Sequence, residues 1–355
     1  MLKKYPEVLK HIPQTLHLKM KKIISIITFI VTGFWSYGQD RSVDVQERVA
    51  LGGVSQQIFL RGKDSTNPVL LILHGGPGFS EFAYFRSFNR DLENKFVVVN
   101  WDQRGTHLSY NDSIEDKSMT FDQIVSDAHE LAGKLKTRFR KNKIFLLAHS
   151  AGTIAGVKYA LRYPEDLYAY IGVGQVVNGM KNERESLSFT LKMAKRNNNK
   201  KALAELEEVQ KNYPSLSLKS LEYVFTERKW LEKFGGVYHT KSFSYLFEHL
   251  DKGERELMND KLASRGGQFS MQHLWKELLS VDFLSADTVF NIPVFLICGK
   301  YDHNTPTDLA RQYFNKIKAP LKQFVIFENS GHLIPFEEPD TFNELLTQTI
   351  LNKSL

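Results

Sequence analysis

The sequence predicts an α/β fold with a mostly parallel central sheet, helices on both of its faces and an inserted helical segment. Apolar runs without polar alternation recur along the chain, as expected of strands that are covered on both faces. These runs occupy residues 69–73, 95–101, 143–148, 167–173, 292–298 and 323–328. Stretches with helical spacing of apolar residues separate them, and such alternation is typical of a parallel sheet. Between about residues 177 and 280 no strand-like run occurs, which predicts the helical insertion.

The remaining elements follow from local signals. Two strands at 43–51 and 54–61 flank Gly52-Gly53, which indicates a hairpin. Helices are expected at residues 121–138, with Thr120 as N-cap, and at 151–163, 307–317 and 339–351. The chain is therefore expected to divide into a leader at 1–38, a first part of the α/β core at 39–176, a helical cap at 177–280 and a second part of the core at 281–355.

The leader has the layout of a secretory signal peptide. Met20-Lys21-Lys22 precedes the uncharged, largely apolar run Ile23 to Trp35, and small residues at Ser36 and Gly38 favour cleavage ahead of Gln39. We therefore expect a secreted or periplasmic protein. An uncleaved signal anchor that tethers the protein to a membrane is the alternative. Residues 1–19 form an N-terminal extension of the leader, and Met20 is an alternative start.

Charge and cysteine content exclude several classes of protein. The first 38 residues hold six lysines and one glutamate, so they account for five of the seven excess positive charges in the chain. The body is nearly neutral, which argues against a nucleic-acid partner. Cys298 is the one cysteine of the chain, so no intramolecular disulfide is possible. The eleven histidines show no metal-ligand spacing, and no dinucleotide or phosphate-binding glycine motif is complete.

Three chemically distinctive residues are expected where strands end. Ser150, in Ala148-His149-Ser150-Ala151-Gly152, has the spacing of a nucleophile elbow, whose sharp turn needs small residues two positions before and after the serine. Asp302 follows the strand at 292–298, and His332 follows the strand at 323–328. The order Ser, Asp, His is that of the α/β-hydrolases. His332 would accept the serine proton, and Asp302 would orient the imidazole.

A glycine-rich turn, His74 to Gly78, ends the strand at 69–73 and exposes backbone N–H groups. The oxyanion formed by attack of Ser150 needs such donors. We expect one from Ala151 and the second from Gly76 in preference to Gly75. The rest of the substrate is expected to lie where Phe79 and the cap meet.

The segment His74-Gly75-Gly76-Pro77-Gly78, together with Asp102-Gln103-Arg104-Gly105, resembles the proline-iminopeptidase branch of the α/β-hydrolase fold family. The resemblance extends from about Val43 to the C-terminus. It implies a metal-free serine hydrolase without a cofactor, with a helical cap between the sixth and seventh strands. It also implies cap carboxylates that hold the free amine of a short peptide substrate, for which Glu183 and Glu185 are the candidates.

The elbow departs from the usual Gly-Gly-Ser-Trp-Gly of that branch, so alternatives stay open. We expect an aminopeptidase similar to proline iminopeptidases, acting on a small amide or ester. A carboxylesterase or lactonase with the same triad is the runner-up, and a non-catalytic binding protein on the same fold is a third hypothesis. A pair of carboxylates facing the pocket would favour peptides. An aromatic or aliphatic lining alone, from Phe243, Phe247 and Trp275 for example, would favour esters. The oligomeric state is left open.

Overall fold

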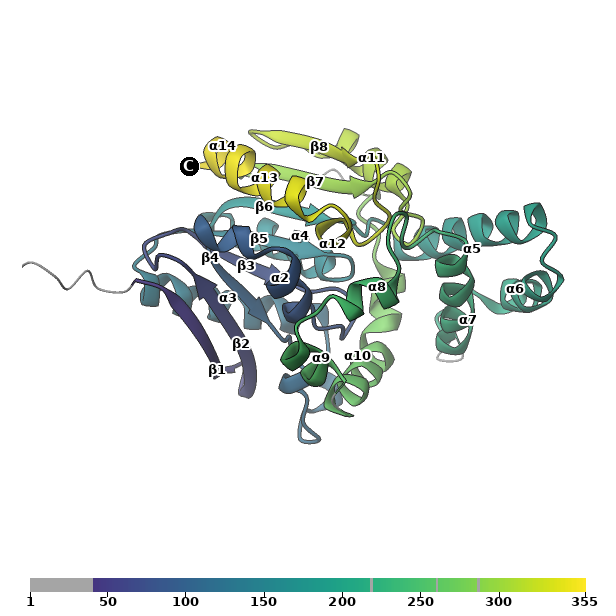
Figure 1. Cartoon of the computed structure of the whole chain (residues 1–355), viewed down its shortest axis with the longest axis horizontal. Coiled ribbons are helices and arrows are strands. Elements are labelled where there is room, and N and C mark those ends of the chain that lie inside the picture. The colour runs from purple at the N-terminus through teal and green to yellow at the C-terminus, as the bar shows by residue number, and fades with distance from the viewer. Residues whose placement is uncertain (1–40, 218–219, 260, 286–287) are drawn as a thin grey trace, which may run out of the picture. The chain divides into compact units, whose positions relative to one another are not determined.

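An eight-stranded sheet forms the centre of the computed structural model (Figure 1). The structure describes residues 41–217, 220–259, 261–285 and 288–355, and the predicted signal peptide or signal anchor at 1–38 lies outside these ranges. Residues 42–355 form a single structural unit. Among the helices of the described ranges, none has the length and apolar character needed to cross a membrane.

The strands follow the order β1-β2-β4-β3-β5-β6-β7-β8 across the sheet. β1 and β2 pair antiparallel, β2 pairs antiparallel with β4, and all other neighbours are parallel, which confirms the predicted mostly parallel sheet. The strands are Val43–Leu51 (β1), Val54–Gly62 (β2), Val69–Leu73 (β3), Val97–Trp101 (β4), Ile144–His149 (β5), Leu167–Val173 (β6), Val294–Gly299 (β7) and Lys322–Phe327 (β8).

Alternate residues of the central strands pack into two separate hydrophobic clusters, one on each face of the sheet. On β3, Leu71 and Leu73 join the cluster that includes α3, α4 and α11, while Leu70 and Ile72 join the cluster that includes α2 and the C-terminal helices. The period of two along a strand explains this division. The helices of the two faces are Phe121–Phe139 (α3), Gly152–Arg162 (α4) and Thr307–Lys316 (α11), and Phe82–Phe88 (α2), Ile334–Glu337 (α12), Pro339–Glu344 (α13) and Leu351–Ser354 (α14).

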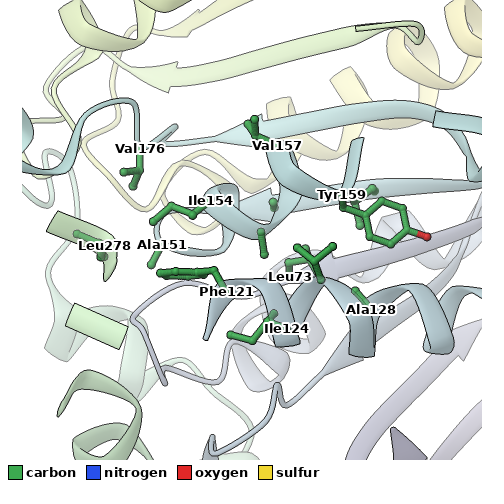
Figure 2. Close-up of a cluster of buried hydrophobic side chains, with 14 of the residues drawn as sticks. Leu73, Phe121, Ile124, Ala128, Ala151, Ile154, Val157, Tyr159, Val176 and Leu278 are labelled. Atoms are coloured by element: carbon green, nitrogen blue, oxygen red, sulfur yellow. The ribbon is translucent and has the colours of Figure 1, made fainter. Parts of the chain in front are cut away.

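Figure 2 shows part of the first cluster, which includes Ala151, the residue after Ser150. Leu73 from β3, Phe121 and Ile124 from α3, and Ile154 from α4 surround Ala151. As predicted, Thr120 caps α3, because its side chain accepts a hydrogen bond from the backbone N–H of Gln123. Two details differ from the prediction: α2 has no counterpart among the predicted helices, and the C-terminal helix is interrupted by a π-helical segment at Leu345–Ile350.

The residues between β6 and β7 form mainly helices. The segments that enter and leave this insertion are joined by backbone hydrogen bonds next to the core, which we call the stem. The stem forms where Gly179 N–H donates to the Val281 carbonyl (2.9 Å) and Phe283 N–H donates to the Val177 carbonyl (2.8 Å). The helices of this insertion, green to teal in Figure 1, are Gly179–Arg196 (α5), Lys200–Asn212 (α6), Ser220–Lys233 (α7), Phe243–Glu248 (α8), Lys252–Met258 (α9) and Lys261–Ser280 (α10).

A buried ion pair joins the turn after β4 to helix α3 and to the β1–β2 hairpin. Arg104 Nε donates to Asp127 Oδ2 (2.9 Å), and both side chains are almost fully buried. Arg104 Nη2 also donates to the Gly52 carbonyl (2.9 Å) in the hairpin turn. Gln56 and Gln123 donate further hydrogen bonds to the Asp127 carboxylate. The Asp102 to Gly105 segment therefore has a structural role through Arg104.

Replacing Asp127 with Asn should lower the free energy of unfolding by about 3–5 kcal/mol, because the Arg104 charge stays buried without its carboxylate. Urea unfolding followed by circular dichroism measures this change. Lys134→Gln on the same helix is the matched control, since its ion pair with Glu130 is exposed, and it should shift stability by less than about 0.5 kcal/mol. Equal effects of the two variants would contradict the structural role of the buried pair.

Candidate active site

Ser150 lies in a tight turn between β5 and α4 with a left-handed backbone, φ +52°. The turn fits only small neighbours. A Cβ on Gly152 would lie 2.5 Å from the carbonyl oxygens of both Leu73 and His74. The Ser150 N–H donates to the Val173 carbonyl (2.9 Å) at the end of β6, which fixes the turn against the sheet. A non-glycine residue with positive φ is uncommon and is characteristic of functional turns.

The structure brings Ser150, His332 and Asp302 into one line of hydrogen bonds. Ser150 Oγ lies 2.9 Å from His332 Nε2, and His332 Nδ1 lies 2.8 Å from Asp302 Oδ2. The carboxylate only accepts, so Nδ1 carries the ring proton and Nε2 accepts from the serine hydroxyl. The three residues follow the C-terminal ends of β5, β7 and β8, where the loops of a parallel sheet converge.

Asp302 is held by four donors. The backbone N–H groups of Asn304 (2.9 Å) and Thr305 (2.8 Å) donate to Oδ1, and the Thr305 hydroxyl (2.8 Å) joins His332 at Oδ2. Burial alone would raise the pKa of Asp302, but the charge and hydrogen bond of His332 and the bonds from Thr305 hold the pKa below its ordinary value. The carboxylate therefore stays ionised beside His332.

The insertion supports the loops that carry His332 and Asp302. The His332 N–H donates to the Val237 carbonyl (2.7 Å), and the His303 N–H donates to the Gly236 carbonyl (2.9 Å). Gly331 packs against Val237, where a Cβ would collide with backbone atoms. Residues 236 and 237, between α7 and α8, thus contact both loops.

Of the two glycines predicted as oxyanion donors, the structure places Gly76 at the cavity beside Ser150 and Ala151. The Gly75 N–H points instead to Glu81 Oε1 (3.4 Å), so a carboxylate already accepts its hydrogen bond. Gly75 still lies close to Ser150, since a Cβ there would lie 2.9 Å from Ser150 Cβ. Gly75 therefore allows the two turns to approach, and Gly76 and Ala151 are the two predicted oxyanion residues that line the cavity.

A cavity of about 140 Å³ adjoins Ser150. It is small beside the roughly 300–1,000 Å³ of pockets for drug-sized ligands. Polar groups from Asn182, Glu183, Arg228 and Asn304 line part of its wall. Apart from the Ser150 turn, the rest of the wall is largely apolar. It comes from Val176, Val224, Phe225, Met271, Trp275 and Leu278.

Glu183 belongs to a buried charged cluster at this cavity. Arg228 Nη2 donates to both carboxylate oxygens of Glu183 (2.7 and 2.6 Å), and the Tyr213 hydroxyl donates to Oε2. Arg228 also pairs with Glu227, which accepts from the hydroxyls of Ser186 (2.9 Å) and Thr190 (2.7 Å). Two carboxylates share one guanidinium, so the ionised cluster has one excess negative charge.

Glu185 and Phe79, the other two predicted substrate contacts, do not line the cavity. Glu185 is two residues beyond Glu183 on α5, so it points to a different side of the helix, and it pairs with Lys181 (3.8 Å). Phe79 packs against Tyr84 with ring centroids 5.8 Å apart. The geometry thus separates Glu183 from the other two candidates. Within the described ranges, no cluster of three or more His, Cys, Asp or Glu side chains is arranged to hold a metal ion.

A family model for serine aminopeptidases (S33) matches residues 64–339, which is most of the chain. The chain belongs to the serine aminopeptidase family. It is 32% identical over 314 residues to a probable aminopeptidase, YbaC, of Bacillus subtilis, covering 87% of this chain and 97% of that protein. It is 29% identical over 321 residues to a proline iminopeptidase of Saccharolobus solfataricus, covering 87% and 93%. The predicted proline-iminopeptidase-like branch is confirmed.

Solved structures of other proteins share the fold of this serine aminopeptidase family member. The proline iminopeptidase of Mycobacterium smegmatis superimposes with a TM-score of 0.64 at 14% identity, covering 87% of this chain and 99% of that one. VinJ superimposes with a TM-score of 0.65 at 18% identity, covering 88% and 99%. At such identities the likeness concerns the fold, and it confirms the predicted α/β-hydrolase architecture.

Sequence reasoning missed Asn182, Glu227 and Arg228. Glu183, Ser186 and Thr190 lie three and four residues apart, so they form one polar side of α5, which in sequence looks the same as a solvated helix face. Arg228 lies among several charged residues of α7, and no local motif distinguishes it. Their burial against each other becomes visible only when α5 and α7 are packed together.

Proposed function

We propose that the protein is a serine hydrolase that removes a single N-terminal residue, with proline as the first candidate, from a short peptide or small amide. The observation that carries the proposal is the hydrogen-bonded line from Ser150 through His332 to Asp302, whose Ser150 end adjoins a small cavity. The cluster with one excess negative charge contributes Glu183 and Arg228 to the wall of this cavity. Membership of the serine aminopeptidase family and the names of the relatives support the same substrate class.

In this mechanism Ser150 Oγ attacks the scissile carbonyl carbon while its proton passes to His332 Nε2. Asp302 stabilises the imidazolium that forms. The Ala151 and Gly76 N–H groups donate to the oxyanion, and loss of one such donor typically costs about 2.7–4 kcal/mol. His332 then protonates the leaving amine as the C–N bond breaks. A water that gives its proton to His332 then attacks the acyl carbon. The bond from that carbon to Ser150 Oγ breaks, Ser150 Oγ takes the proton back from His332, and the amino acid is released.

The cavity supports an aminoacyl group rather than a longer acyl chain. Its volume suits one small residue, and its apolar wall suits an aliphatic or pyrrolidine side chain. The excess negative charge of the Glu183, Glu227 and Arg228 cluster attracts an ammonium group. An ester or lactone has no such cation, so the polar wall favours the aminopeptidase over the carboxylesterase or lactonase.

Replacing Ser150 with Ala should abolish cleavage of prolyl-arylamide and labelling by a fluorophosphonate probe, because the acyl-enzyme cannot form. For subtilisin-type triads the loss in kcat is about 10⁶-fold. Arylamide kinetics and in-gel fluorescence measure the two effects, and Ser188→Ala on the exposed side of α5 is the control. A wild-type protein that never labels, or a Ser150→Ala variant that labels equally, would establish a non-catalytic protein.

Glu183→Gln should lower kcat/KM for substrates with a free amine by about 10- to 100-fold, because the cluster loses its excess charge and a charged hydrogen bond contributes about 1.5–3 kcal/mol. N-acetylated amides and simple esters should be cleaved poorly by both proteins. Glu185→Gln is the matched control. Glu185 lies on a different side of the same helix, so this variant should retain wild-type kinetics. If blocking the amine leaves wild-type kcat/KM unchanged, the substrate is an ester or lactone instead.

We also propose that the protein is exported, since residues 20–38 have the layout of a signal peptide. After expression in a Gram-negative host and fractionation of the cells, we expect the protein in the periplasm or the medium. Mass spectrometry should identify Gln39 as the first residue of the mature chain. A membrane-bound protein that retains residues 23–35 would indicate the uncleaved anchor. Recovery of the full-length chain in the cytosol would contradict export.

A further inference from the structure

Glu81 and His149 form a buried ion pair beside the catalytic line, and the mechanism described above does not use it. Glu81 Oε1 lies 2.5 Å from His149 Nδ1, and the side chains are 2% and 1% exposed. Neither residue lines the cavity. Burying two charged groups is costly unless both are well paired, so the contacts of this pair indicate what it holds in place.

The pair connects three segments that the catalysis needs. Glu81 Oε1 accepts from the Gly75 N–H (3.4 Å) in the glycine turn, next to the oxyanion donor Gly76. His149 directly precedes Ser150 in the elbow. His149 Nε2 lies 3.1 Å from the carbonyl oxygen of His332, the proposed base. The oxyanion turn, the nucleophile and the base are thus joined through one carboxylate and one imidazole.

The proton count of the pair follows from its partners. A carbonyl oxygen and a carboxylate both accept, so each ring nitrogen of His149 faces an acceptor. The two hydrogen bonds together need one proton more than neutral His149 with ionised Glu81 provides. Glu81 Oε2 is buried, with no hydrogen-bond partner among the described residues, so the Gly75 N–H at Oε1 is the one donor besides His149 that these residues give the carboxylate.

The surrounding groups favour retention of this proton. Burial alone lowers the pKa of His149, but the charge and hydrogen bond of Glu81, the His332 carbonyl and the more distant Asp302 raise it above the ordinary histidine value. The His332 imidazole lies beside the pair, with its ring centroid 5.0 Å from that of His149. The other titratable groups near the pair are His74 in the glycine turn, whose pKa is lowered, chiefly by burial, and Tyr84 on α2, whose pKa is raised, chiefly by burial. Neither supplies a cation at neutral pH.

We propose that Glu81 and His149 are positioning residues whose shared proton holds the oxyanion turn and the His332 loop against the Ser150 elbow; this inference rests on the proposed serine-hydrolase function. Loss of the proton leaves a net negative charge on the pair beside Gly75. Neutral His149 can then keep only one of its two hydrogen bonds, either to the Glu81 carboxylate or to the His332 carbonyl. That negative charge destabilises the oxyanion by repulsion. The glycine turn and the loop that carries His332 are then no longer both held against the Ser150 elbow.

The test is Glu81→Gln, which keeps the size of the side chain and removes its charge. A single amide oxygen cannot stabilise the doubly protonated ring, so one of the bonds to Gly75 or His332 is lost. We expect kcat for prolyl-arylamide to fall at least tenfold with KM changed less than threefold. Wild-type kcat/KM should decline on the alkaline side, and in the variant this decline should move to lower pH because His149 loses the carboxylate that retains its proton.

Three further variants make the result decisive. His149→Gln and the double variant Glu81→Gln/His149→Gln should lose about as much kcat as Glu81→Gln alone, since the pair acts as one unit. His129→Gln removes a second histidine–carboxylate pair, with Asp166 (2.9 Å), that makes no contact with the cavity, and should leave kcat and the pH profile unchanged. Thermal unfolding shows whether each variant is folded. If Glu81→Gln is unfolded, the kcat and the alkaline limb of the double variant are compared with those of wild type instead.

A folded Glu81→Gln variant with wild-type kcat and an unmoved alkaline limb would overturn the positioning role. So would additive losses in the double variant. These outcomes are distinct from failure of the proposed function, in which Ser150→Ala and wild type would behave alike. An inactive Ser150→Ala variant beside a fully active Glu81→Gln variant would leave the hydrolase intact and remove only the pair from its machinery.

Discussion

The site depends on the close approach of two backbone turns, one after β3 and one after β5. Gly152 packs against the carbonyl groups that end β3, and Gly75 packs against the side chain of Ser150. Neither position has room for a Cβ, so both contacts require glycine. This approach places Ser150, the proposed nucleophile, beside Gly76 and Ala151 at one cavity. The N–H groups of these two residues are the proposed oxyanion donors, and preorganised donors are effective because no reorganisation accompanies the reaction.

Three buried charged clusters differ in their balance of charge, and the difference matches their expected roles. Arg104 and Asp127 are one cation and one anion, and they tie the core together. The proton shared by Glu81 and His149 likewise makes that pair neutral. The Glu183, Glu227 and Arg228 cluster is the exception, with one excess negative charge at a cavity. An unbalanced buried charge is costly, and a cationic ligand would complete it.

The sequence was informative where chemistry depends on local backbone geometry. Ser150, Asp302 and His332 follow strand ends, so turn residues and apolar runs were enough to propose them. Contacts between distant helices were not accessible in this way. Glu183 and Glu185 look equivalent in sequence, and only the packing of α5 against α7 separates them. Gly75 and Gly76 also look alike, and they differ because Glu81, the residue just before α2, accepts the hydrogen bond of Gly75.

The carbonyl groups of residues 236 and 237 accept hydrogen bonds from the loops of Asp302 and His332, so the insertion and His332, the proposed base, are not separable modules. Exchanging the insertion with that of a relative is one way to change the wall of the cavity, since residues of α5, α7 and α10 line it. In this chain, a graft that replaced everything between β6 and β7 would also replace the support of the base. An exchange limited to α5 through α7 would alter the pocket and leave that support in place.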